Sequence, residues 1–372
     1  MAKTVYQRPV SEDYANITHP DRKMSLERVS RRQPRYPFVP RRGIRTGAAQ
    51  TFLGRFRPAG VASVLTNEQM LVLDAGEDRT AQNGGRTVQL HGYLNMVCDR
   101  ESCRGLILLL HGWEGSSHAV YNLSMANLLL NAGYDIFRLN LRDHGPGIAV
   151  NPYALNRGFF LGTLIDEVAV AAERVSALAG AKDFHIVGLS LGGNFALRLA
   201  IRNGEQPIHR LRRVIAVNPA INPLRATRRL DKHPVYRRYF RNSWLNSMYA
   251  KQQLFPDLID AHKLSEHATI YQMTDWIVRT YTSFKSADEY FSSYRIHGHM
   301  FRDLTIPTTL ITARDDDIIP VVDFYAFAPH PLLDIEIHRY GGHVGFIDAP
   351  PLHHALPDLI LKAIEPCHSV ST

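Results

Sequence analysis

The chain lacks several features that would place it outside the ordinary globular proteins. Among its 372 residues, the longest apolar run is GLILLL at 105–110, which has the length of a strand. A membrane-spanning helix needs ~20 such residues. An arginine pair at 31–32 is not followed by the apolar region of an export signal, and neither low-complexity sequence nor an internal repeat is present. We therefore expect a globular protein without a membrane span.

Cysteine is also scarce. The chain has only Cys98, Cys103 and Cys367, which is too few for a disulfide framework, and none of them has zinc-site spacing. Cys98 and Cys103 flank a predicted hairpin tip and are close enough in sequence to pair. Reduced thiols in a cytoplasmic protein are the favoured interpretation, and we expect no metal site.

Positive charge is concentrated at one end of the chain. The net charge is +8, and residues 1–58 carry 13 Lys and Arg against 4 Asp and Glu, so the remainder is close to neutral. A basic arm of this kind binds anionic membrane or nucleic acid in some proteins. The alternative is that its arginines pair with carboxylates of the body, and we favour it. Nucleic acid is not an expected partner, and peripheral contact with anionic membrane remains a hypothesis.

Strand-like and helix-like segments alternate after the arm. The candidate strands read QMLVLDAG, TVQLHGYLN, GLILLLHG, DIFRLNLR, FHIVGLS, RVIAVNPA, TTLITARDD and LDIEIHRYGG. The first two have the spacing of a hairpin, and the later ones are apolar throughout, as strands buried on both faces are. Amphipathic helices separate them. The pattern predicts an α/β fold with a mostly parallel eight-stranded sheet and helices on both faces, whose ligands bind at the carboxyl ends of the strands.

The alternation stops between residues 221 and 306. This segment is rich in Arg, Tyr, Trp and Phe and has helical periodicity. We interpret it as a helical lid inserted into a body formed by residues 59–220 and 307–372, with residues 1–58 as the basic arm. A lid would exclude water and shape an apolar acyl pocket. A helical layer that only stabilises the body is the alternative.

A serine lies where a strand meets a helix. Gly188, Ser190 and Gly192 form the pattern G-x-S-x-G between the strand DFHIVGLS and the helix LGGNFALRLA. Such an elbow strains the backbone of the serine, and glycines two residues before and after it remove side chains that would collide. The pattern predicts a nucleophile elbow with Ser190 exposed above the sheet at a helix N-terminus.

A serine nucleophile needs a base and a carboxylate that orients the base. His343 follows two glycines in the loop after the last predicted strand, and Asp316 ends an earlier strand in the run DDD. We expect Asp316 to face the histidine and Asp315 and Asp317 to cap the chain or to face solvent. His144, at the end of another strand, is a rival base, although it precedes the serine in the chain.

An oxyanion hole would complete the site. One donor is the backbone amide of Leu191, directly after the serine. The loop HGWEGSS at residues 111–117 follows the first long parallel strand and offers the amide of Trp113 as the second donor. The indole of Trp113 is expected to form a pocket wall or to pack in the core, and the ring of His111 to brace the loop.

These segments together resemble the YheT-like hydrolases of the α/β-hydrolase superfamily, close to the abhydrolase-domain proteins. The resemblance runs from about Phe38 to the C-terminus and rests on GAAQTFLGRF, HGWEGSSHAVY, LNRGFF, GLSLGGN, YQMTDWIVRTYTSF, ADEYFSSY, ARDDDIIP and GGHVGFI. It implies hydrolysis of carboxylic esters, in some relatives of lipid acyl groups, without a cofactor. It also implies a triad of Ser190, Asp316 and His343 with the Trp113 and Leu191 amides as oxyanion donors.

Two departures from the family pattern concern the substrate. The basic arm is longer and richer in arginine than the family's usual lead-in, and Asp143 in RDHGPG stands where a glycine is common. The predicted function is a serine hydrolase acting on a small-molecule or lipid ester. Thioester, peptide or C–C bond hydrolysis on the same fold remains an alternative, as does a non-catalytic, membrane-associated scaffold.

Overall fold

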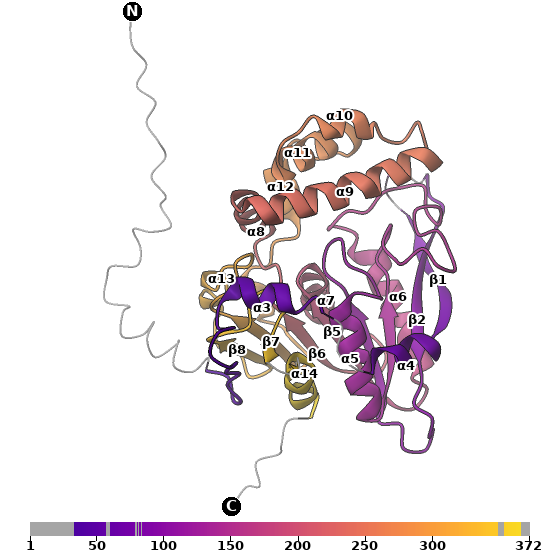
Figure 1. The fold of residues 1–372 in the computed structure, drawn as a ribbon. Coiled ribbons are helices and arrows are strands. Elements are labelled where there is room, and N and C mark those ends of the chain that lie inside the picture. The colour runs from indigo at the N-terminus through magenta and orange to yellow at the C-terminus, as the bar shows by residue number, and fades with distance from the viewer. Residues whose placement is uncertain are drawn as a thin grey trace, which may run out of the picture.

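The structure is a computed structural model that describes residues 33–56, 60–78, 80, 82, 84–348 and 353–365 (Figure 1). Most of the predicted basic arm, residues 1–32, and Cys367 lie outside the described residues. Cys98 is exposed, Cys103 is buried, and both are free thiols. Among the residues that the structure describes, no helix combines the length and the apolar character needed to cross a membrane.

One large sheet forms the centre of the molecule. Its strands are β1 (Gln69–Glu77), β2 (Thr87–Asn95), β3 (Gly105–Leu110), β4 (Tyr134–Leu139), β5 (Asp183–Leu189), β6 (Leu211–Val217), β7 (Thr308–Ala313) and β8 (Leu333–His338). Their spatial order is β1-β2-β4-β3-β5-β6-β7-β8. β2 runs antiparallel to β1 and to β4, and the other neighbouring pairs are parallel. The predicted α/β fold class with a mostly parallel eight-stranded sheet is confirmed.

Helices cover both faces of this sheet because its central strands are apolar on both sides. In β3, Leu106, Leu108 and Leu110 belong to one core cluster, while Ile107 and Leu109 belong to the other. Successive side chains of a strand point to opposite faces, so each cluster fills one face. The first face is covered by α6 (Ile165–Leu178) and α7 (Leu191–Arg202), and the second by α4 (Val61–Thr66), α5 (Val120–Asn131) and α14 (Leu356–Ile364).

Five helices lie between β6 and β7 and stack over the carboxyl ends of the strands (Figure 1). They are α8 (Pro223–Lys232), α9 (Pro234–Leu254), α10 (Ala261–Ser265), α11 (Ile270–Tyr281) and α12 (Ala287–Ser293). Side-chain caps explain where two of them begin. Asn222 accepts a hydrogen bond from the amide of Arg225 at the start of α8, and Thr269 forms a capping box with Gln272 at the start of α11. We call these five helices the lid.

Short elements complete the described chain. They are η1 (Gly298–Phe301), α13 (Val322–Tyr325), β9 (Ile347–Asp348) and β10 (His353–His354), of which the last two pair with each other. Near the start of the described chain, α3 (Gly47–Leu53) packs against the carboxyl edge of the sheet. A Cβ atom on Gly47 would lie 1.8 Å from the carbonyl oxygen of Asp315, so α3 and the end of β7 are in direct contact.

Candidate active site

Ser190 sits between β5 and α7 in a backbone conformation that few residues other than glycine adopt. Its φ is 54° and its ψ is −116°. Its amide donates to the carbonyl of Val217 at 2.9 Å, and its own carbonyl accepts from the amide of Asn194 at 3.1 Å. These bonds hold the serine on a sharp turn from strand to helix, as the elbow pattern predicts.

The two glycines of the pattern are needed for close packing. A Cβ atom on Gly188 would lie 2.1 Å from the carbonyl oxygen of Gly192, and one on Gly192 would lie 2.3 Å from the carbonyl oxygen of Leu110. Both distances are far below van der Waals contact with backbone atoms that cannot move aside. Glycine at these positions therefore allows α7 to start directly against β3 and β5.

The structure brings the three predicted triad residues together although they are far apart in the chain. His343 Nε2 lies 3.0 Å from Ser190 Oγ, and His343 Nδ1 lies 3.0 Å from Asp316 Oδ2. Asp316 is buried, and its Oδ1 accepts from the amides of Ile318 and Ile319 at 2.7 and 2.9 Å. A buried carboxylate is tolerable only when it is hydrogen-bonded in this way. The arrangement orients the imidazole between a hydroxyl and a carboxylate.

Within the run of three aspartates, Asp316 is the residue that contacts the ring of His343. Asp315 instead accepts a hydrogen bond from the amide of Gly342 at 2.9 Å, and burial raises the pKa of this carboxyl group. Asp315 thus holds the loop that carries His343, while Asp317 is half-buried. Asp316 thus faces the histidine, whereas Asp315 binds the loop of His343 and does not face solvent as expected.

Asn218 is a site residue that the sequence reasoning missed. It follows β6, and its Nδ2 donates to Asp316 Oδ2 at 2.6 Å and to the carbonyl of Gly342 at 3.2 Å. Its φ of 42° is unusual, and Asn is among the residues that adopt such a conformation most readily. A polar residue directly after the apolar strand RVIAV was the available signal.

A second missed contribution comes from α3. Thr51 Oγ1 accepts from the amide of His343 at 2.9 Å. The buried side chain of Gln50 donates to the carbonyls of Ile44 and Ile347 at 2.7 and 2.9 Å and accepts from the amide of Ile347 at 2.6 Å. The segment GAAQTFLGRF was part of the predicted family resemblance. Its contact with the loop that carries His343 was not predicted. These residues position the loop between β8 and β9, which carries His343.

The loop after β3 passes close to the serine. The amides of Gly112, Glu114 and Gly115 donate to Tyr121 Oη, His144 Nε2 and the Gly112 carbonyl. Within the described chain, the amides of Trp113 and of Leu191 have no such acceptor. A Cβ atom on Gly112 would lie only 3.1 Å from Ser190 Cβ, so the loop runs directly past the serine. The geometry is compatible with the predicted oxyanion donors.

Two histidines near this loop form hydrogen bonds with backbone groups. His144, the rival base, has Nδ1 2.7 Å from the carbonyl of Arg142 and accepts the Glu114 amide at Nε2. His111 contacts the carbonyl of Gly112 through Nδ1 at 2.7 Å, accepts an amide at Nε2, and has a pKa that burial lowers well below its usual value. Both rings brace the loop, and His343 is the histidine bonded to the serine hydroxyl.

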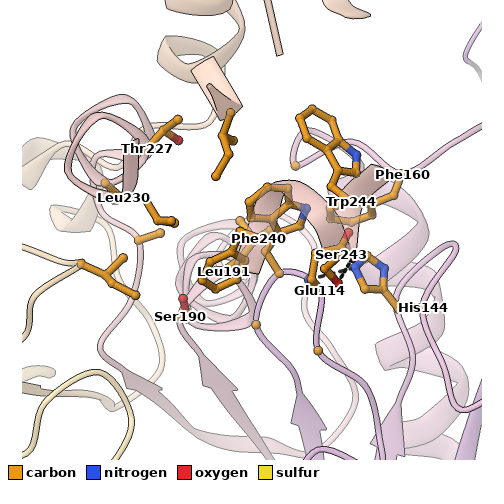
Figure 2. A pocket seen from close by; sticks show the side chains of 18 of the residues that line it. Glu114, His144, Phe160, Ser190, Leu191, Thr227, Leu230, Phe240, Ser243 and Trp244 are labelled. Atoms are coloured by element: carbon orange, nitrogen blue, oxygen red, sulfur yellow. Dashed lines mark hydrogen bonds between the residues drawn. The ribbon is translucent and has the colours of Figure 1, made fainter. Parts of the chain in front are cut away.

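A cavity of about 700 Å³ opens above Ser190. Figure 2 shows the serine just above the strand ends, with Leu230 and Trp244 of the lid across the cavity from it. The lining is largely apolar and aromatic, and the Trp113 indole forms part of it, stacked on Phe240 with ring centroids 5.5 Å apart. Such a lining suits an apolar ligand.

Two carboxylate residues, Glu114 and Asp143, line the cavity, and Glu114 binds the lid. Glu114 Oε2 accepts from the hydroxyls of Ser243 and Ser247 of α9 at 2.7 and 3.1 Å (Figure 2 draws the first of these bonds). The loop after β3 and the lid are thereby joined. In the described part of the chain, no group of three or more His, Cys, Asp and Glu residues is arranged to hold a metal ion.

The chain is similar in sequence to several known proteins. An abhydrolase domain-containing protein of Dictyostelium discoideum is 26% identical over 250 residues, which is 65% of this chain and 61% of that protein. Phospholipase ABHD3 of Mus musculus is 23% identical over 252 residues, with 66% and 59% covered. The putative esterase YheT of Escherichia coli (strain K12) is 23% identical over 256 residues, with 66% and 72% covered. The match thus spans about three-fifths of the length of the first two relatives.

The predicted resemblance to YheT-like hydrolases is confirmed by these relatives. The family model described as the alpha/beta hydrolase fold matches residues 105–350, which run from the start of β3 past His343. The sheet order, the elbow at Ser190 and this match point to one family. The chain belongs to the α/β-hydrolase fold family.

Proposed function

We propose that the protein is a serine hydrolase that cleaves carboxylic esters, with Ser190 as nucleophile and His343 as base. The observation that carries this proposal is the continuous hydrogen-bonded chain from Ser190 through His343 to Asp316, with 3.0 Å at each step. When Nδ1 of the neutral imidazole donates to the carboxylate, Nε2 is left to accept the serine proton. Asp316 then stabilises the imidazolium that forms.

The reaction proceeds in two halves. Ser190 Oγ attacks the ester carbonyl carbon while its proton passes to His343 Nε2, and the amides of Leu191 and Trp113 stabilise the negatively charged oxygen. The C–O bond to the alcohol then breaks, the alcohol takes the proton from His343, and an acyl-Ser190 ester remains. Water attacks this ester with His343 again as base, which releases the carboxylic acid and restores the serine.

The acyl side of the substrate is proposed to be apolar. The cavity above Ser190 is lined largely by apolar and aromatic side chains of the lid. Two relatives bear the names phospholipase and putative esterase, which supports an acyl ester as substrate. Each buried methylene contributes about 0.8 kcal/mol, so kcat/KM should rise roughly four-fold per methylene until the cavity is full.

Labelling with a fluorophosphonate probe tests the nucleophile. The folded full-length chain is expected to react, because the probe needs an activated serine, and the Ser190→Ala variant is expected not to react. Ser124→Ala, a buried serine of α5, is the matched control and should label like the parent. A folded parent chain that does not react, or a Ser190→Ala variant that reacts equally, contradicts the proposal.

A substrate panel separates ester hydrolysis from other reactions of the same fold. Nitrophenyl esters of increasing acyl length, acyl thioesters, aminoacyl amides and a C–C hydrolase substrate would be compared by kcat/KM. The proposal expects the esters to be turned over best, with a rise and then a plateau in acyl length. Preference for a thioester, an amide or a C–C bond would replace ester hydrolysis by that reaction while retaining Ser190 as nucleophile.

A further inference from the structure

Four large apolar side chains are exposed at and just after the end of α3 and near the start of α9. Phe52 is 60% exposed and Phe56 47%, with their ring centroids 5.5 Å apart, and Val235 and Tyr239 are 68% and 44% exposed. Val235 and Tyr239 are four residues apart in α9, which places them on one side of that helix. Phe56 lies beyond the end of α3, and its ring contact with Phe52 brings these two side chains together. We call these four residues the mouth surface. Grouped apolar exposure of this kind marks an interaction site more often than isolated exposed residues do.

The mouth surface lies beside an exposed part of the cavity above Ser190, and its residue Tyr239 lines that cavity. Arg55 and Tyr239 both line the cavity and are both exposed to solvent, so the cavity opens between α3 and α9. The guanidinium of Arg55 lies 4.3 Å from the centroid of the Tyr239 ring, which joins the two helices at this point. Phe56 directly follows Arg55 in the chain, and Val235 precedes Tyr239 by about one turn of α9, so exposed apolar side chains lie next to this part of the cavity.

Positive charge accompanies these apolar side chains. Helices α8 and α9 contain eight Lys and Arg residues and one acidic residue, Asp231. Among the eight, Lys251 is buried against Asp143, and Arg225 and Arg228 form ion pairs with Asp323 and Asp288. Arg238 is exposed and follows Val235 by three residues, which places it on the same side of α9. Lys232 is exposed at the end of α8, directly before α9. With Arg55, exposed cations flank the apolar side chains on both helices.

We propose that the mouth surface docks on the surface of an anionic phospholipid bilayer, with its apolar side chains inserted and the cations near Phe52 and Val235 contacting lipid phosphates. Apolar side chains next to Lys and Arg are what binds proteins to the interface of such membranes. Docking in this orientation places the entrance against the lipid, so that an acyl ester reaches Ser190 without crossing water. This last step rests on the proposed function, whereas the binding itself does not.

Vesicle co-sedimentation of the full chain tests the docking surface. The experiment uses the Ser190→Ala background, so that binding is measured without turnover of lipid. Two double variants are compared with the parent: Phe52→Ser with Phe56→Ser, and Lys232→Gln with Arg238→Gln. The matched controls are Leu178→Ser and Arg174→Gln with Lys182→Gln, because all three residues are exposed at the opposite, amino edge of the sheet.

The parent is expected to bind vesicles of phosphatidylcholine and phosphatidylserine more tightly than vesicles of phosphatidylcholine alone. Removal of two cations should weaken binding roughly 25-fold, because each contributes about five-fold, and high salt should abolish this difference. The phenylalanine variant should weaken binding at both salt concentrations, and the control variants should bind like the parent. Fluorophosphonate labelling of the same variants with Ser190 restored would show that the fold is intact.

The proposal is overturned if the phenylalanine double variant and the cation double variant both bind vesicles as tightly as the parent. The proposal is therefore also overturned if residues 1–32 account for all vesicle binding. Equal binding to neutral and anionic vesicles also overturns it. Because labelling and vesicle binding are separate measurements, a chain that binds vesicles but is not labelled contradicts the proposed function alone, and a labelled chain that does not bind contradicts the docking surface alone.

Discussion

Lys251 and Asp143 form a buried ion pair that joins the lid to the body, with Lys251 Nζ 2.7 Å from Asp143 Oδ1. Lys251 lies on α9, and it also donates to the carbonyls of Tyr153 and Asn156 at 3.1 and 2.5 Å. Asp143 follows β4, and its Oδ2 accepts the amide of Phe160 at 2.9 Å. Burial raises the pKa of Asp143 and lowers the pKa of Lys251, and the attraction between the two charges opposes both shifts.

The ion pair with Lys251 gives a structural role to Asp143, which stands in RDHGPG where a glycine is common. Asp143 has a φ of 60°, a conformation in which glycine is favoured over residues with a side chain. The ion pair compensates for this backbone strain, because the Asp143 carboxylate is the partner of a fully buried lysine. We infer that Asp143, which also lines the cavity, positions α9 through Lys251.

Removal of one member of this pair should destabilise the protein strongly. Asp143→Asn leaves the Lys251 charge buried without its counter-ion, and we expect a loss of about 3–5 kcal/mol in the free energy of unfolding, measured in urea. Asp143→Asn combined with Lys251→Met should cost less than the sum of the two single changes. As a control, Asp288→Asn breaks the exposed pair with Arg228 and should cost at most about 1 kcal/mol. Equal losses for Asp143→Asn and Asp288→Asn would contradict the role of the pair.

Asn218→Ala is expected to impair catalysis without a matching loss of substrate binding. The variant removes the donor to Asp316 and to the carbonyl of Gly342, and hydrogen bonds to charged groups contribute about 1.5–3 kcal/mol. Steady-state kinetics should show a kcat lower by roughly 10- to 100-fold with KM little changed. Asn222→Ala, which removes the cap of α8, should lower stability by about 1 kcal/mol and leave kcat near the parent value. The two variants should therefore separate positioning of the triad from stability of the lid.

Thr51→Val tests whether α3 positions His343. Valine has the shape of threonine but cannot accept the hydrogen bond from the His343 amide. We expect kcat to fall about five-fold, because a net bond of about 1 kcal/mol is lost from the loop that aims the imidazole. Thr66→Val on α4 loses only an exposed bond to the carbonyl of Ala62, and should leave kcat unchanged. A Thr51→Val variant with the parent's kcat would limit α3 to a structural role.

Acid should destabilise the fold through its buried histidines. Burial lowers the pKa of His91 and of His185 from 6.5 to about 4. Their contribution to stability is complete above pH 6.5, where both are neutral in the folded and unfolded chains, and it is lost as pH falls from 6.5 toward 4. Each pH unit in this window costs up to about 1.4 kcal/mol per histidine.

Urea denaturation between pH 7 and pH 4 measures this dependence. His185→Gln should reduce its slope by up to one proton, while His209→Gln, a change at an exposed position, should leave the slope unchanged. An identical slope in the parent and the His185→Gln variant would show that His185 does not contribute to acid sensitivity.

The positions of the predicted triad could be inferred because each depends on a local pattern. A G-x-S-x-G sequence between a strand and a helix defines the turn at Ser190 by sterics alone, and parallel strands bring their carboxyl ends to one edge of the sheet. Asp316 and His343 each follow a strand, so their meeting with Ser190 follows from the order of the strands. The alternation of apolar strands and amphipathic helices likewise determines the fold class.

Tertiary structure alone decided which distant groups support these residues. Asn218, Thr51 and the pair of Asp143 with Lys251 act through contacts between segments that are about 100 or more residues apart, as with the 108 residues between Asp143 and Lys251. No local pattern encodes such contacts, because they depend on how the lid and α3 pack on the sheet and, for Asn218, on which strand ends lie side by side. By itself the sequence determined the fold class and the candidate triad, since strand ends and glycine sterics are local. The packing of the lid and α3 determined the second layer of positioning residues, the cavity and its entrance, since these exist only where separate segments meet.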